Sequence, residues 1–390
     1  MVSDSSGSGE PKIVHVLTHS ALRRDAVEYN ITEGWHAALG RAIATHTDYE
    51  NVECWTVDYE LETTRHRQRD GIDYRVFPSR LLPGTRNEVV KPYIGQAKPG
   101  VEISVPLIRA TRRVASGNAA IHLHSDTYVN TYLLAALVRD APVFLQHHGG
   151  LRGVVPLERL VFRNLAHAFV LTPEKRRNLT DDVGLPPERV SVRTMGVNTE
   201  QFTSTGCSPA DLGYESEELL VYVGKYSEYK GLDRVLDAFE SLREDRDVTL
   251  ALLGGERTDP LYDRAVRTAG VDAITEYLPT EEVRNYYAAA DAYVSFPVET
   301  SLRSGDCGII APVEALACGT PVVSPVLRLF PDESRDEVGY LPSATVDLER
   351  GIESVLASPP DPERCVDFAT RHFSWKRVAA DVAAVYDEWL

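Results

Sequence analysis

The chain has 390 residues, which is more than one compact core usually holds, so two domains of about 150–200 residues each are expected. Hydrophobic residues make up 43% of it and charged residues 25%, which is typical of a soluble globular protein and excludes a disordered or fibrous one. The 58 acidic residues outnumber the 41 basic ones, and the net charge of −17 argues against a nucleic-acid-binding protein because phosphates would be repelled.

The beginning of the chain, MVSDSSGSGEPK, is polar and lacks the basic start and apolar centre of a signal peptide. The sequence also contains no continuous apolar run long enough for a membrane helix, so we expect a cytoplasmic protein. The five cysteines are far apart and form no CxxC pair, which indicates neither a disulfide framework nor a zinc site.

In the first half, short β-branched runs alternate with longer helical stretches, a pattern typical of parallel βα units. Residues 12–18 predict a buried strand, and residues 32–46 predict a helix that opens with a threonine cap. Further strands are expected at 52–58, 74–79, 120–125, 142–148, 166–172 and 190–196. Together these segments predict one doubly wound sheet.

The same rhythm starts again after a turn-rich, acidic stretch near 198–217. Strands are expected at 218–224 and 248–255, with an amphipathic helix at 231–244 between them, and the alternation continues through ITEYLP, DAYVSFP and TPVVSP. We therefore predict an α/β protein with a flexible N-terminus (1–10), two Rossmann-like doubly wound domains (11–200 and 201–373) and a C-terminal helix (374–390) that starts at a Ser374 cap.

Several common enzyme signatures are absent. The first strand is followed by only one glycine where the dinucleotide fingerprint GxGxxG needs three, and no Walker loop, HExxH or GxSxG occurs. These absences remove nicotinamide-dependent dehydrogenases, P-loop enzymes, zinc proteases and α/β-hydrolases from consideration.

Two lysines stand at the end of the first strand of the second half. Lys225 follows Gly224, and Lys230 and Gly231 open the next helix. Cations beside a helix amino end favour a diphosphate, although ordinary solvated turn lysines would give the same spacing.

The stretch SGDCGIIAPVEALACG contains two acids that flank a glycine-containing turn. Glu314 is expected to begin an alanine-rich helix and suits the two hydrogen bonds of a ribose diol, while Asp306 and the amides of Gly308, Ile309 and Ile310 suit a sugar ring. A carboxylate at a helix start is also a favourable dipole partner with no other role, and on these residues alone that interpretation is the better one.

Taken together, these stretches resemble the donor-binding domain of the family 4 retaining glycosyltransferases. The resemblance rests on VGKYSEYKGLDRVLDAF and on EALACGTPVV, and it extends over AIHLHS, PVFLQHHGG, AHAFVLTPEKRRNLTDDVGLPPERVSVRTMGVNTEQF and ITEYLPTEEVRNYYAAADAYVSFP in the family's order. It implies the GT-B fold, in which two Rossmann-like domains face a cleft and the last helix crosses back to the first domain.

Carried over by position, the resemblance implies roles for single residues. Lys225 and Lys230 would contact the donor's phosphates, Glu314 its ribose and Asp306 the transferred sugar. His148 would lie near the reacting carbon. The family also implies base recognition near Tyr277 and Leu278, no cofactor besides the nucleotide sugar, and no metal.

This sequence departs from the family pattern at two places, which leaves alternatives open. Asp306 stands where Glu is usual and the preceding VETSLRSG is longer than expected, so Glu299 is the competing sugar-contacting acid. The first-domain loop has only Gly34 where the family has paired glycines, which makes Arg23 and Arg24 candidate phosphate or acceptor contacts.

Three further histidines bear on the site. His147 competes with His148, one residue out of register and therefore on the opposite face of the strand. His122 and His124 share one face of their strand and could pair as metal ligands, but we expect them to be structural because the family needs no metal.

We therefore expect a metal-independent retaining glycosyltransferase that moves a sugar from a nucleoside diphosphate to an unidentified glycan, lipid carrier or small molecule. The alternatives are a catalytically silent sugar-nucleotide-binding subunit and another GT-B enzyme such as a nucleotide-sugar epimerase. Two arginine clusters in the first half, Arg65, Arg67 and Arg69 and then Arg109, Arg112 and Arg113, predict peripheral contact with an anionic membrane or phosphorylated lipid, although a solvated surface explains them as well.

Overall fold

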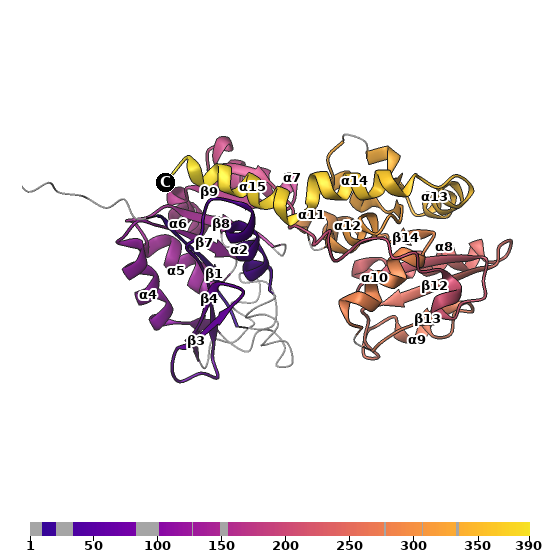
Figure 1. The fold of residues 1–390 in the computed structure, drawn as a ribbon, viewed down its shortest axis with the longest axis horizontal. Coiled ribbons are helices and arrows are strands. Elements are labelled where there is room, and N and C mark those ends of the chain that lie inside the picture. The colour runs from indigo at the N-terminus through magenta and orange to yellow at the C-terminus, as the bar shows by residue number, and fades with distance from the viewer. Residues whose placement is uncertain are drawn as a thin grey trace, which may run out of the picture. The chain divides into compact units, whose positions relative to one another are not determined.

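The computed structural model describes residues 10–20, 34–82, 101–126, 128–148, 155–276, 278–305, 307–332 and 335–390. The chain divides into two compact units, which we describe separately (Figure 1). Unit 1 combines Met1–Met195 with Val378–Leu390, and unit 2 is Gly196–Arg377. Among the described residues, no helix combines the length and the apolar character needed to cross a membrane.

Unit 1 is built on an eight-stranded sheet in the order β10-β9-β8-β7-β1-β2-β4-β3. All neighbouring strands are parallel except β3, which runs antiparallel to β4 at the edge. The strands are β1 (Lys12–Leu17), β2 (Val52–Asp58), β3 (Arg65–Arg69), β4 (Ile72–Pro78), β7 (Ala119–His124), β8 (Val143–Gln146), β9 (His167–Val170) and β10 (Val190–Val192), and a separate pair is formed by β5 (Arg80–Leu82) and β6 (Val101–Ile103).

The central strands of unit 1 are buried on both faces, as the near-continuous apolar sequence of β1, β7 and β8 requires in a parallel sheet. Its helices are α2 (Trp35–His46), α4 (Val105–Ala115), α5 (Val129–Leu137), α6 (Val155–Val161), α7 (Pro173–Arg177) and most of α15 (Trp375–Asp387). Helix α15 reaches this unit because Tyr386 is fully buried and packs on Phe144, with ring centroids 4.6 Å apart.

Unit 2 contains a six-stranded parallel sheet in the order β13-β12-β11-β14-β15-β16. Its strands are β11 (Glu218–Val223), β12 (Val248–Leu253), β13 (Val271–Ala273), β14 (Ala292–Val294), β15 (Val322–Val323) and β16 (Gly339–Tyr340). The helices are α8 (Leu232–Leu242), α9 (Tyr262–Ala265), α10 (Thr280–Ala289), α11 (Glu299–Ser304), α12 (Ile310–Ala317), α13 (Val346–Ala357) and α14 (Pro362–Phe373). Helix α8 buries Leu232, Val235, Leu236, Phe239 and Leu242 at helical spacing against this sheet.

Some element predictions differ from the structure. The expected strand at 190–196 ends at Val192, and the strand expected in ITEYLP lies earlier, at β13. The sequence does not predict strand β3, RHRQR, because all five residues are exposed and show no apolar alternation. It does not predict α11 either, because six residues are too few to show a helical period. Ser374 does cap the last helix, since its Oγ accepts a hydrogen bond from the backbone N–H of Arg377 at 3.3 Å.

Candidate functional site

The sheet of unit 2 reverses its strand order between β11 and β14. From β11 the chain adds β12 and β13 on one side, and then β14, β15 and β16 on the other. In open parallel sheets, ligands bind at the carboxyl ends of the two strands that flank such a reversal. The segments that follow β11 and β14 therefore define the candidate site.

The turn after β11 is fixed by a glycine. Gly231 has a φ of +73°, and a Cβ added there would lie 1.7 Å from the carbonyl oxygen of Phe296, which follows β14. The hydroxyl of Tyr229 also lies 3.1 Å from the hydroxyl of Ser304. The turn with its two lysines is thus packed directly against the 296–304 segment, two chain regions that the sequence alone does not connect.

Both lysines of this turn are accessible at its surface. Lys225 is exposed, whereas Lys230 is half-buried and places its Nζ 5.9 Å from the centre of the Tyr229 ring. Lys230 ends a short 3-10 helix, Glu228–Lys230, that leads through Gly231 into α8. Cations at the amino end of a helix form an attractive environment for a phosphate.

Glu314 lies inside α12, which begins at Ile310, so the prediction that Glu314 begins this helix is wrong. Its side chain is half-buried. Its Oε2 accepts a hydrogen bond from the Tyr287 hydroxyl at 3.0 Å. Burial raises the pKa of this carboxyl to about 7, while the hydrogen bond from Tyr287 acts in the opposite direction. Tyr287, which comes from α10, is a site residue that the sequence did not reveal, because nothing in the sequence pairs it with Glu314.

The loop before α12 carries the proposed sugar-binding amides. Gly308 is exposed with a φ of +80°, Ile309 is buried, and Ile310 is the first residue of α12. Asp306 lies outside the described residues. The competing acid, Glu299, is exposed, and its two oxygens are held by Arg303 at 3.0 Å and Arg328 at 2.5 Å, which lower its pKa.

Other predicted contacts are only partly described. Leu278 is half-buried just before α10, and Gly34 is buried just before α2. Tyr277, Arg23 and Arg24 lie outside the described residues, as does Thr32, the expected helix cap.

In unit 1, His148 follows β8 and is half-buried. Its Nε2 lies 2.8 Å from His124 Nδ1 in a hydrogen bond, and its ring packs edge-on against Trp35 with centroids 5.1 Å apart. Burial lowers the pKa of His148 to about 3, so the ring is neutral at physiological pH. A neutral imidazole can donate one hydrogen bond and accept another.

His147 has different neighbours from His148. Its Nε2 lies 3.9 Å from Asp126, whose carboxylate pairs with Lys175 at 2.5 Å. Burial alone would raise the pKa of Asp126, but Lys175 and His147 hold it below its usual value. His147 therefore belongs to a buried charged group, whereas His148 contacts the other histidines of the sheet.

Comparison with known proteins agrees with this geometry. The family described as glycosyl transferases group 1 matches residues 209–372, which cover the sheet of unit 2 and both candidate segments. Residues 209–372 belong to that family. This group 1 glycosyl transferase domain contains Lys225, Lys230 and Glu314.

Individual relatives extend the likeness. The chain is 28% identical to a D-inositol 3-phosphate glycosyltransferase of Corynebacterium diphtheriae over 59% of this chain and 58% of that protein, so the chain spans little more than half of that relative's length. It is 26% identical to an alpha-maltose-1-phosphate synthase of Mycolicibacterium smegmatis over 70% of this chain and 80% of that one. Beyond the group 1 domain, HepE of Anabaena, solved with UDP and glucose, is similar with a TM-score of 0.64 and 14% identity over 97% of this chain and 99% of that chain. The fold is GT-B, as expected.

Proposed function

We propose that this chain is a family 4 retaining glycosyltransferase that transfers a sugar from a nucleoside diphosphate to an acceptor hydroxyl. The observation that carries the proposal is the packing of the Lys230 turn against the 296–304 segment. Gly231 lies against the backbone of Phe296, and the hydroxyls of Tyr229 and Ser304 form a hydrogen bond. It brings a pair of cations to the chain region that leads into the Glu314 helix, at the strand-order reversal where this type of sheet binds ligands.

The chemistry follows from charge development. As the bond from the sugar to the diphosphate lengthens, negative charge grows on the leaving group, and fixed cations and helix N–H groups stabilise it by several kcal/mol in a site that excludes water. Lys225 and Lys230 would supply the cations. We propose that the acceptor attacks from the face that the diphosphate leaves, with a donor phosphate oxygen taking the acceptor proton, so that no metal enters the step.

Five residues would hold the rest of the donor. Glu314 would accept the ribose hydroxyls, Asp306 would contact the transferred sugar, and the amides of Gly308, Ile309 and Ile310 would face its ring. Because HepE was solved with UDP, UDP-sugars are the first donors to test. His148, with a neutral ring, would lie close to the reacting sugar as a hydrogen-bonding group.

We propose an anionic acceptor or an anionic surface near it. Arg109, Arg112 and Arg113 are exposed on α4, and β3 presents exposed Arg65, Arg67 and Arg69. The two relatives named above carry a phosphate in the name of their acceptor or product. Flotation with anionic vesicles at low and high salt separates the sources: salt-sensitive binding supports a lipid-linked acceptor, whereas its absence favours a soluble phosphorylated one.

The proposal is tested with Lys230→Ala. We expect kcat for transfer from the preferred donor to fall by at least about 100-fold, because a phosphate-stabilising charge is lost from the transition state. The thermal unfolding midpoint should hardly change. Lys376→Ala, which removes an exposed lysine elsewhere in unit 2, is the matched control and should keep full activity.

The assay uses a panel of nucleotide sugars with sugar phosphates, D-inositol 3-phosphate and lipid phosphates as acceptors, and it follows release of the free nucleoside diphosphate. Near-normal turnover by the Lys230→Ala variant would contradict the assignment. Tight UDP binding without turnover on the whole panel would identify a silent binding subunit instead, and conversion of the donor to its epimer would identify an epimerase.

A further inference from the structure

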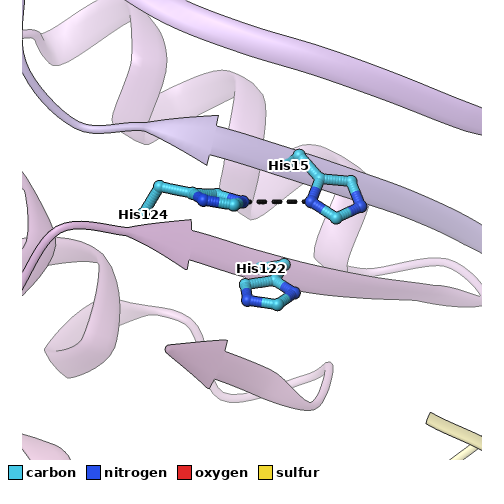
Figure 2. A group of neighbouring side chains, drawn as sticks. All are labelled: His15, His122 and His124. Carbon is cyan, nitrogen blue, oxygen red and sulfur yellow. Dashed lines mark hydrogen bonds between the residues drawn. The ribbon is translucent and has the colours of Figure 1, made fainter. Parts of the chain in front are cut away.

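Three imidazoles meet in the core of unit 1, on the two strands where its sheet also reverses order. His15 lies on β1, and His122 and His124 lie on β7 (Figure 2). The strands pair in parallel with His15 opposite His122, so all three rings lie on one face of the sheet. Each ring offers a nitrogen within 4.8 Å of the others, and all three side chains are fully buried.

Two of these rings are hydrogen-bonded to each other. His15 Nδ1 and His124 Nε2 lie 3.0 Å apart, and the opposite nitrogen of His124 is bonded to His148. His122 Nδ1 lies 2.5 Å from the Tyr386 hydroxyl, and its buried Nε2 has no partner among the described residues. An ion bound by His15 Nδ1, His122 Nε2 and His124 Nε2 would replace the His15–His124 hydrogen bond and give the His122 nitrogen a partner.

Buried nitrogens without partners need a physical reason. An unpaired buried polar atom costs about 1–3 kcal/mol, and an ion at the site is one of the few explanations for keeping it. Within the part of the chain that the structure describes, His122 Nε2, His15 Nε2 and both nitrogens of His36 are in this state, and His122 Nε2 belongs to the proposed ligand set. His36 packs edge-on against His124 with centroids 6.0 Å apart, next to the three-histidine group.

The hydrogen bonds around the rings also suit a metal. Neutral imidazole is the form that ligates metals, and metal-bound histidines normally hold their second nitrogen in a hydrogen bond. Tyr386 already makes that outer hydrogen bond for His122, and His148 makes it for His124.

We propose that His15, His122 and His124 bind one divalent transition-metal ion of the zinc type. All-imidazole donors suit Zn²⁺, Co²⁺, Ni²⁺ and Cu²⁺, and they do not suit Mg²⁺ or Ca²⁺, which prefer oxygen. The site lies in unit 1 and is separate from the lysines and the carboxylate of the donor site in unit 2, so it stands whether or not the proposed function holds.

The ion would also position His148. A metal on His124 Nε2 leaves the ring proton on Nδ1, and that N–H must then donate to His148 Nε2. His148 is consequently fixed with its own proton on Nδ1, as a hydrogen-bond donor. Without a metal, the two hydrogen bonds that link His15, His124 and His148 can also form with donor and acceptor exchanged in each.

The test uses the full-length chain after removal of metals with a chelator. Titration with Co²⁺ followed by visible absorption, and with Zn²⁺ by calorimetry, should show one saturable site per chain and a higher unfolding midpoint. X-ray absorption of the zinc-loaded wild type should show nitrogen ligands without sulfur. Mg²⁺ should give no binding. No saturable stoichiometric binding of Co²⁺ or Zn²⁺ would overturn the proposal without any variant.

His122→Gln removes one ligand and should weaken Zn²⁺ binding at least 100-fold. The matched control is His167→Gln, because His167 is a buried histidine of the same sheet that bonds to Ser191 and lies outside the three-histidine group. Zinc affinity of the His122→Gln variant equal to that of the wild type would place the ion elsewhere and also overturn the proposal. Nitrogen NMR of the histidine rings then reports whether zinc binding fixes the proton of His148 on Nδ1. If His124 is not a ligand, zinc will not change the position of this proton.

Discussion

The two units use the same sheet topology for different chemistry. In each one the strand order reverses beside the first strand, between β1 and β7 in unit 1 and between β11 and β14 in unit 2. The first place gathers neutral histidines, whereas at the second two lysines lie in the turn after β11. The position of a candidate site therefore follows from the sheet topology, and the ligand that it suits follows from the side chains at that position.

The charge of the chain follows the same division. Up to residue 200 there are 24 basic and 23 acidic residues, and beyond it 17 basic and 35 acidic ones. Within this acidic half, Lys225 and Lys230 place two positive charges in the turn after β11. Ten of the eleven histidines lie in the first half, where burial keeps several of them neutral.

In both units a tyrosine hydroxyl forms a hydrogen bond with an ionisable side chain, Tyr287 with Glu314 and Tyr386 with His122. In one case the hydroxyl adjusts a carboxyl that can ionise near neutral pH. In unit 1 the Tyr386 hydroxyl is hydrogen-bonded to the His122 ring, which burial keeps neutral. Three substitutions, two in unit 2 and one in unit 1, test this comparison of the two units.

The largest effect is expected from Gly231→Ala. The new Cβ would meet the Phe296 carbonyl at 1.7 Å, so the turn and the segment after β14 must move apart, at a cost above about 3 kcal/mol of unfolding free energy. Urea unfolding measures it. Gly213→Ala is the control, since Gly213 has a similar φ of +85° but open space around it, and should cost only about 1–2 kcal/mol. Equal losses for the two variants would show that the turn is not locked onto β14.

A smaller effect is expected from Tyr287→Phe. The lost hydrogen bond raises the pKa of Glu314 above about 7, so more of the carboxyl is protonated at neutral pH and accepts ribose hydroxyls less well. We expect UDP affinity at pH 7 to fall about 5-fold, the worth of one hydrogen bond of about 1 kcal/mol, and to recover as pH rises. Calorimetry between pH 6 and pH 9 measures this.

Glu314→Gln is the control for that titration. Its UDP affinity should be low and independent of pH over the same range, because the titrating group is gone. A Tyr287→Phe curve that superimposes on the wild type would show that Glu314 does not contact the nucleotide.

The smallest effect is expected from Tyr386→Phe. It leaves His122 Nδ1 without its partner while keeping the ring that packs on Phe144, so we expect a loss of about 1 kcal/mol in unfolding free energy. Thermal unfolding of the metal-free protein measures it. Tyr49→Phe breaks the partly exposed bond to Asp387 at the same helix and should cost less. The reverse order would mean that the hydroxyl contributes nothing to the histidine group.

The sequence by itself determined the fold class, the succession of two α/β halves along the chain and the family of the second half. These depend on local periodicity and on contiguous motifs such as the Lys225–Gly231 turn and the Glu314 helix. The tertiary structure alone decided which distant residues meet. Tyr287 reaches Glu314, Gly231 closes on Phe296, and His15 joins His122 and His124, since parallel strands bring together residues far apart in the chain, and no local pattern encodes that pairing.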